Sequence, residues 1–367
     1  MHFPISKPTI TEREKDYVAD AVSSGWVSSQ GTYIQRFEDG FARFCGTKHC
    51  VSVSNGTNAL FLILKALGIG PGDEVIIPDF SFIATANAVE YTGATPVFVD
   101  IDDDTLCMAP DAFNAAVTVR TRIVMPVHIY GHPAPMNEIV EIADARGISV
   151  LEDCAEAHGA SIRGRSVGTW GTAGVFSFYG NKILTTGEGG AIVLDDPVLA
   201  DRLRLLRDHA MSPTRRYWHE EVGYNFRMTN LQAALGVAQL ERAKEIIEKK
   251  RLIFSWYARE IGDLQGIRLN QKADWAEPVY WMICLELDTR KAGLRQRLMA
   301  DLMARGIETR PYFYRMSTMP MYETADTPIS QAVSARGVNL PSYFDLTEQD
   351  VIEICCAIRE VVACLEC

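Results

Sequence analysis

One lysine in this sequence stands where its amine could act as a nucleophile. Lys182 follows the uncharged apolar run 173–179 and precedes the glycine-rich segment 185–190, so we expect it to leave a buried strand. Most lysines are solvated surface charges. A lysine drawn out of water has a lower pKa, however, and its neutral amine can form a Schiff base with an aldehyde cofactor. Lys182 is therefore a candidate catalytic residue if the rest of the chain supplies a cofactor site.

Polar groups that could bind such a cofactor follow two of the predicted strands. Gly56 and Thr57 come after a short strand at 51–53 and open an apolar helix. Their N–H groups and the helix dipole could hold a phosphate, although a plain strand–helix turn would have the same residues. Asp153 ends the predicted strand 148–153. A carboxylate there is either an exposed loop group or the partner of a protonated ring nitrogen.

Two further residues complete a possible cofactor site. Phe82 is either a core residue or an aromatic plate for a flat heterocycle. Ser177 places a hydroxyl inside an apolar strand, where burial requires a hydrogen-bond partner. A phosphate cradle, a stacking ring, a carboxylate and a lysine amine are together what pyridoxal phosphate requires. The residues therefore predict this cofactor, whereas no G-x-G-x-x-G fingerprint supports a nicotinamide enzyme.

The order of the predicted elements indicates the fold class. Short apolar strands alternate with helices through the first part of the chain, which is typical of a mostly parallel α/β sheet covered on both faces. The pattern changes after the long helical stretch 230–261, where a strand at 279–287 and a closing helix at 346–365 follow. We predict a large cofactor-binding α/β domain over residues 1–240 and a smaller α+β domain over residues 241–367.

Composition excludes several classes of protein. The net charge of −11 argues against a general nucleic-acid binder. The sequence shows neither a signal-peptide pattern at its start nor an apolar stretch of about 18 residues, so we expect a cytoplasmic protein without a membrane segment. The C-x-x-C pair Cys364 and Cys367 has no second ligand pair, and His128 and His132 lack metal-site spacing. We predict no metal.

Ordered motifs along the chain resemble those of a known enzyme family. They are NGTNAL, GPGDEVIIP, ATPVFVDID, VMPVHIYGH, LEDCAEAHGA, FSFYGNKILTTGEGG and GYNFRMTNLQAALG. They resemble the nucleotide-sugar aminotransferases of the DegT/DnrJ/EryC1/StrS family over the chain from about Ile5 to the closing helix. The resemblance implies a fold-type-I pyridoxal-phosphate enzyme that moves nitrogen from glutamate to a keto sugar carried on a nucleotide. It also implies a homodimer with shared active sites.

The same resemblance implies roles at the cofactor. Lys182 would bind the cofactor covalently as an imine and then move protons. Asp153 would pair with the ring nitrogen, and Glu156 would lie near the phenolic oxygen. The remaining residues would stack on the ring or hold the phosphate, Asn225 doing so from the second subunit: Phe82, Gly56, Thr57, Ser177 and Asn225.

Residues expected near the sugar nucleotide are assigned by the resemblance as well. Trp26, Val27 and Ser28 match a segment that contacts the sugar nucleotide. His158 is either a core histidine or a group close to the sugar or cofactor. Arg216 belongs to the aromatic and basic run RRYW, which is either a solvated loop or a pyrophosphate contact. A guanidinium suits a pyrophosphate, because its donors pair with phosphate oxygens in a fixed fork.

The strings NKILTTGEGG and RRYWHEEVGYNFRMTN are most similar to one branch of the family. That branch aminates carbon 4 of GDP-4-keto-6-deoxy-mannose to give GDP-perosamine, a precursor of lipopolysaccharide O-antigen or a related glycan. Lys182 favours amination, because the dehydratase branch has His at this position. RPYFYRMSTMPMY lacks a His that many relatives carry, which leaves amination at carbon 3, or a UDP- or dTDP-linked sugar, as alternatives. A non-catalytic regulatory protein that binds pyridoxal phosphate is a third.

Overall fold

The first part of the chain forms one large sheet. The computed structural model describes residues 2–287 and 293–366. Seven strands lie in the order β1-β9-β8-β5-β4-β2-β3, and only β9 runs against its neighbours. The strands are β1 (His49–Val53), β2 (Glu74–Pro78), β3 (Thr95–Val99), β4 (Thr121–Val124), β5 (Ser149–Asp153), β8 (Ala173–Ser177) and β9 (Gly190–Leu194). The predicted mostly parallel α/β fold is confirmed.

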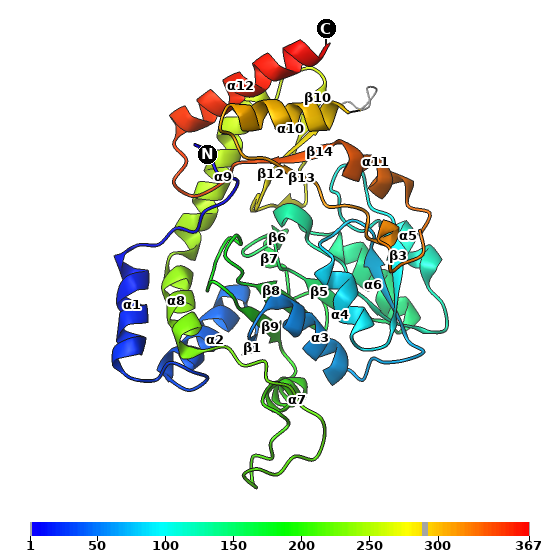
Figure 1. The fold of residues 1–367 in the computed structure, drawn as a ribbon. Helices are drawn as coiled ribbons and strands as arrows, with labels where there is room; N and C mark the ends of the chain where they lie inside the picture. The colour runs from blue at the N-terminus through cyan, green and yellow to red at the C-terminus, as the bar shows by residue number, and fades with distance from the viewer. Residues whose placement is uncertain (1, 288–292, 367) are drawn as a thin grey trace.

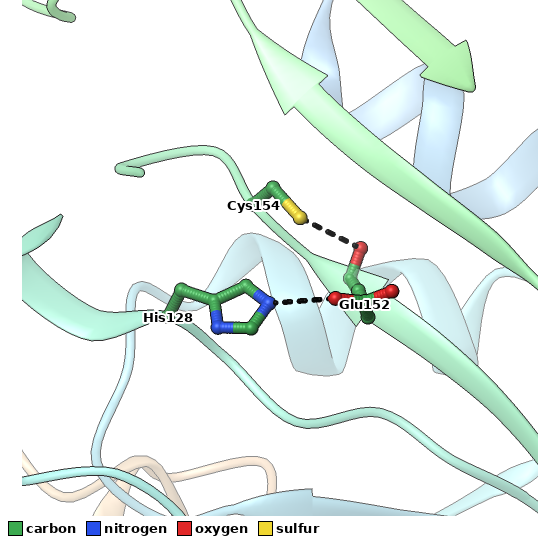
Figure 2. A group of neighbouring side chains, drawn as sticks. All are labelled: His128, Glu152 and Cys154. Carbon is green, nitrogen blue, oxygen red and sulfur yellow. Dashed lines mark hydrogen bonds and ion pairs between the residues drawn. The ribbon is translucent and has the colours of Figure 1, made fainter. Parts of the chain in front are cut away.

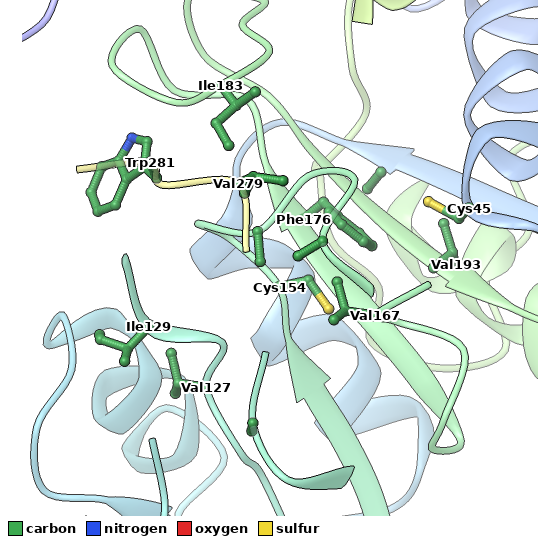
Figure 3. Packing of buried hydrophobic residues seen from close by; sticks show 14 of the residues in the cluster. Cys45, Val127, Ile129, Cys154, Val167, Phe176, Ile183, Val193, Val279 and Trp281 are labelled. Carbon is green, nitrogen blue, oxygen red and sulfur yellow. The ribbon is translucent and has the colours of Figure 1, made fainter. Parts of the chain in front are cut away.

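The strands read as continuous apolar runs because both faces of this sheet are buried. Successive side chains of a strand point to opposite faces, so Val150 and Phe176 enter one apolar cluster while Leu151 and Val175 enter the other. Figure 3 shows part of the first cluster around Phe176. Helices that contribute to the first cluster include α2 (Thr32–Cys45), α5 (Pro110–Ala116), α6 (Met136–Arg146) and α8 (Asn230–Glu241). Those of the second are α3 (Gly56–Ala66), α4 (Ala84–Glu90) and α7 (Pro197–Arg207).

A smaller antiparallel sheet lies in the C-terminal part, among its helices (Figure 1). Its order is β10-β12-β14-β13, and its strands are β10 (Ile267–Leu269), β12 (Ile283–Leu287), β13 (Arg310–Pro311) and β14 (Gly337–Leu340). A third apolar cluster fills the space between this sheet and its helices. The helices are α9 (Ala243–Ile261), α10 (Leu294–Ala304) and α12 (Glu348–Glu366).

The long helix α9 connects the two parts. Ile246 near its start belongs to the cluster beside the large sheet, whereas Tyr257 near its end belongs to the C-terminal cluster. The boundary expected after residue 240 falls close to the junction of α8 and α9 and stays a prediction. The start of the chain reaches across it, because Phe3 lies in the C-terminal cluster and forms a bridge with Ile307.

The remaining elements lie around these two sheets. A small three-stranded sheet has the order β11-β6-β7, and α1 packs against α8. No described helix is both long enough and apolar enough to cross a bilayer. The bounds are α1 (Glu12–Ser23), β6 (Ser161–Ile162), β7 (Arg165–Ser166), β11 (Ala276–Glu277) and α11 (Pro328–Arg336), with short 3₁₀ turns at Ile129–Gly131 and Met316–Thr318.

The carboxyl ends of the parallel strands meet at one edge of the large sheet. β5 ends at Asp153 and β8 ends at Ser177, while β1 leads through Asn55 into α3. In open parallel sheets this edge is where ligands bind. The fold therefore gathers polar groups that are more than a hundred residues apart in sequence.

Candidate active site

A cavity of about 690 Å³ lies at this edge of the sheet. Residues from the large sheet form part of its wall, and Trp281, Arg310 and Phe313 from the C-terminal part of the chain form another. Seven of the residues singled out from the sequence line it: Gly56, Thr57, Phe82, Asp153, Glu156, Ser177 and Lys182.

One end of the cavity is built to hold an anion. Asn55 caps α3, and its side-chain oxygen accepts a hydrogen bond of 2.8 Å from the N–H of Asn58. The N–H groups of Gly56 and Thr57 in the first turn have no acceptor within the helix, so they can bind a phosphate. A side chain at Gly56 would place its Cβ 2.9 Å from the Cβ of Ser177. Glycine therefore allows the helix end to approach β8 closely.

A buried carboxylate lies elsewhere in the cavity wall. Oδ2 of Asp153 accepts a hydrogen bond of 2.9 Å from Thr85, and Oδ1 accepts one of 3.1 Å from the N–H of Ala155. Burial raises the pKa of Asp153 above its usual value, while these hydrogen bonds and the amine of Lys182 oppose the rise. A cationic group in contact with the carboxylate would stabilise its ionised form. A protonated ring nitrogen fits this requirement.

Lys182 faces a second buried carboxylate. Its Nζ lies 3.7 Å from Oε1 of Glu156, and Oε2 of Glu156 accepts a hydrogen bond of 2.7 Å from the N–H of Tyr130. Burial lowers the pKa of the Lys182 amine, and the neighbouring carboxylates of Glu156 and Asp153 partly offset this. Burial likewise raises the pKa of Glu156 to about 7, against the effect of Lys182. Burial thus favours the neutral form of both groups, the amine of Lys182 and the carboxyl of Glu156.

Aromatic side chains from distant segments complete the cavity. The Nζ of Lys182 lies 3.9 Å from the centre of the Trp281 ring, and the indole N–H donates a hydrogen bond of 2.7 Å to the carbonyl of Asn181. Phe82 is 54% exposed although it is a large apolar residue, and its ring lies 6.0 Å from that of Phe313. A flat ring in the cavity could therefore stack on Phe82.

Three buried polar side chains near the sheet edge form a structural network (Figure 2). His128 Nδ1 accepts from the N–H of Ala134, so Nε2 donates to Glu152 at 3.1 Å. Glu152 also accepts three backbone N–H bonds, and Cys154 contacts its carbonyl. Although the three side chains are close enough to share a metal ion, these contacts occupy the Glu152 oxygens that would bind it. The side chains of Cys364 and Cys367 lie outside the described residues.

Five of the residues predicted to bind the cofactor or the sugar nucleotide do not line the cavity of their own chain. Asn225 pairs with Asp208 in an isolated bridge beyond the end of α7. The backbone carbonyls of Trp26 and Ser28 accept hydrogen bonds from Asn230 at the start of α8. Figure 1 shows the segment after α7, which carries Arg216, extending away from the body of the molecule. The five are Trp26, Val27, Ser28, Arg216 and Asn225.

His158 is placed in the core instead of in the cavity lining. It is fully buried, and its ring lies 5.3 Å from that of Phe176 and 5.1 Å from that of Phe178. Burial lowers its pKa to about 3, so the imidazole is neutral. His158 does not line the cavity, and its burial fits the core alternative, whereas a position close to the cofactor stays a prediction.

Several cavity residues carry no signal in the sequence. Thr85, Tyr130, Trp281, Arg310 and Asn339 all line the cavity. Thr85 lies in an ordinary amphipathic helix, and the last three belong to the C-terminal part, far from the predicted strand ends. The apolar run VYWMI, which holds Trp281, reads only as a strand.

The fold and this cavity together define the class of protein. A mostly parallel sheet with a buried lysine, a buried aspartate and a helix N-terminus at its carboxyl edge fits a pyridoxal-phosphate enzyme of fold type I. Residues 8–359 match the DegT/DnrJ/EryC1/StrS aminotransferase family, and the chain belongs to that family.

Known proteins resemble the chain over its whole length. It is 45% identical to a GDP-perosamine synthase of Escherichia coli O157:H7 and 44% identical to one of Caulobacter vibrioides, in both cases over 98% of each chain. A putative sugar aminotransferase from Streptococcus pneumoniae, in its PLP form, is 25% identical and superposes with a TM-score of 0.95 over the whole of both chains. The protein is thus a pyridoxal-phosphate-dependent aminotransferase, as the sequence predicts.

Replacing the carboxylate beside Lys182 should change the titration of the amine. We expect Glu156→Gln to lower the pKa of Lys182 by about one unit, because a neighbouring anion stabilises the ammonium form. The pH at which Lys182 of the cofactor-free protein becomes reactive toward an amine-acylating reagent, followed by peptide mass spectrometry, measures this shift. Glu188→Gln, which alters another residue of the cavity lining, is the control and should leave the midpoint in place. A midpoint that is unchanged or higher in Glu156→Gln would contradict the pairing.

Proposed function

We propose that the enzyme transfers the amino group of glutamate to carbon 4 of GDP-4-keto-6-deoxy-mannose and thereby produces GDP-perosamine. The relatives named GDP-perosamine synthase support this substrate, because each matches almost the entire chain. The observation that carries the proposal is the buried Lys182 amine facing Glu156 inside the cavity. A lysine there supplies the base that amination needs.

The residues present fit the cofactor, and we propose the following contacts. The N–H groups of Gly56 and Thr57 bind its phosphate together with the Ser177 hydroxyl. Phe82 covers one face of its ring, and Asp153 stabilises the protonated ring nitrogen. When bound, pyridoxal phosphate supplies an electron-withdrawing ring that stabilises negative charge on the carbon next to the transferred nitrogen.

Lys182 and Glu156 move the protons of the reaction in this proposal. In the first half-reaction the neutral Nζ of Lys182 removes a proton from the α-carbon of glutamate. In the second it delivers a proton to carbon 4 of the sugar. Glu156, whose pKa is about 7, can hold or release a proton beside Nζ at each stage. The low exposure of Lys182 lowers the pKa of its amine, which favours the neutral form that can accept a proton.

We further propose that two chains share each active site. Three of the predicted site residues do not line the cavity of their own chain: Asn225, Arg216 and Trp26. All three are exposed, so a second chain could contact them. The segment around Arg216 also exposes large apolar residues, with Tyr217 76% and Val222 80% exposed. Exposed apolar surface of this kind is typical of a protein interface. In a homodimer, Asn225 would reach the phosphate and Arg216 the pyrophosphate in the partner chain's cavity.

The product suggests a cellular role. A nucleotide-activated amino sugar is the form in which a glycosyltransferase receives its donor. We therefore propose that the enzyme acts in the cytoplasm and supplies a precursor for lipopolysaccharide O-antigen or a related glycan.

Removing the proposed base should abolish turnover. We expect Lys182→Ala to lower transamination by several orders of magnitude, because it removes both the covalent attachment and the proton carrier. In the unmodified protein, borohydride should fix the cofactor on Lys182, which a peptide map would show. A reduced adduct on another lysine would contradict the assignment.

Mixed dimers can test the shared site. We expect Lys182→Ala and Asn225→Ala chains, inactive alone, to regain partial activity when they are refolded together, because one of the two hybrid sites is intact. The activity of purified hybrids, carrying a different affinity tag on each chain, measures this. A protein that sediments as an active monomer, or hybrids without recovery, would argue against sharing.

Measuring the two half-reactions separately should show whether Arg216 acts only on the sugar nucleotide. We expect Arg216→Ala to weaken the sugar-nucleotide half-reaction at least tenfold, since a charge-assisted bond to the pyrophosphate is lost, and to leave the glutamate half-reaction nearly unchanged. Rapid-mixing absorbance of the cofactor follows each half-reaction. Arg297→Ala, an exposed arginine on α10, is the matched control. Equal losses in both half-reactions would contradict a pyrophosphate contact.

A further inference from the structure

A second buried lysine lies close to the active-site lysine. Lys250 of α9 and Lys182 both line a small space of about 30 Å³. The side chain of Lys250 is buried, and its Nζ donates hydrogen bonds of 2.6 Å and 2.8 Å to the carbonyl and hydroxyl oxygens of Ser342. Among the described residues no carboxylate pairs with it. Burying an amine is unfavourable, and the two hydrogen bonds to Ser342 offset only part of this effect. The burial of Lys250 at this place therefore calls for an explanation.

A continuous chain of hydrogen bonds joins Lys250 to the residue before Lys182. The hydroxyl of Ser342 accepts from Lys250 and donates to the carbonyl of Trp281 at 3.1 Å. The indole N–H of Trp281 donates to the carbonyl of Asn181 at 2.7 Å. The Trp281 ring then lies 3.9 Å from the Nζ of Lys182. Trp281 is thus held at its backbone and at its ring.

We propose that Lys250 is a positioning residue for the catalytic amine, acting through Ser342 and Trp281. The network fixes the Trp281 ring against Nζ of Lys182 and thereby sets both the place and the proton affinity of that amine. The inference rests on the role proposed for Lys182. It goes beyond that role, because Lys250 does not line the main cavity.

The direction of the effect follows from the groups that face the two amines. A cation over an indole ring is stabilised, so a less firmly held Trp281 lowers the pKa of Lys182. Glu156, Asp153 and His158 are the titratable groups that act on Lys182. A substitution at Lys250 leaves these three side chains in place.

The surroundings of Lys250 determine the pH range of the test. Lys7, paired with Asp345, and Tyr343 line the small space beside Lys250. Burial lowers the pKa of Lys250 to about 7, so above this pH the neutral form of its amine predominates. A neutral amine still has the two hydrogens that its contacts with Ser342 require.

Two variants break the network at different points. Lys250→Met keeps the length of the side chain and removes its donors, and Ser342→Ala removes the hydroxyl that contacts Trp281. In both, above pH 7.5, we expect Lys182 of the cofactor-free protein to react about threefold faster with an amine-acylating reagent than in the unmodified protein. In the complete enzyme kcat should fall about tenfold while the KM for glutamate stays within about twofold, because the amine is misplaced but the substrate site is intact. The double variant should show no further change, since both substitutions cut one chain.

Controls separate positioning from general damage. Lys244→Met makes the same change at an exposed site on α9 and should leave labelling and kcat unchanged. Unaltered labelling of Lys182 in both network variants, with only a lower melting temperature, would overturn the proposal. If Lys250→Met does not fold, Ser342→Ala tests the same link. Because the labelling needs neither cofactor nor sugar, its outcome is independent of whether the proposed transamination is correct.

Discussion

The withdrawal of one lysine amine from water is the constraint on which the rest of this structure depends. Lys182 can act as a base at neutral pH only if burial lowers its pKa, and burial of an isolated ammonium would be strongly unfavourable. The carboxylate of Glu156 at 3.7 Å and the ring of Trp281 at 3.9 Å offset that effect. Burial also raises the pKa of Glu156, so the same desolvation that favours a neutral amine favours a neutral carboxyl beside it.

The two parts of the chain supply this environment jointly. The large sheet brings Asp153, Glu156 and Lys182 to one edge, because its parallel strands all end there. Trp281 and Phe313 arrive from the C-terminal part and enclose the same cavity. Contacts between the two parts are therefore directly relevant to the chemistry.

Sequence patterns predicted those features of the fold that depend on neighbouring residues in the chain. The apolar strands and the residues at their ends, such as Asp153 and Ser177, follow from burial on both faces of a parallel sheet. Trp281 and Thr85 could not be predicted as site residues, because only tertiary packing brings them to the strand ends. For His158 the sequence allowed a core or a site position; its ring packs among phenylalanines, and a role near the cofactor stays a prediction.

The identity of the sugar nucleotide decides which reaction this cavity carries out. The most direct measurement loads the enzyme with pyridoxamine phosphate and mixes it, without glutamate, with GDP-, UDP- and dTDP-linked 4-keto-6-deoxy sugars. Absorbance then reports which of them returns the cofactor to its aldehyde form. We expect rapid conversion by GDP-4-keto-6-deoxy-mannose and little by the UDP- and dTDP-linked sugars. Efficient conversion by a UDP- or dTDP-linked keto sugar, with none by the GDP-linked one, would contradict this expectation.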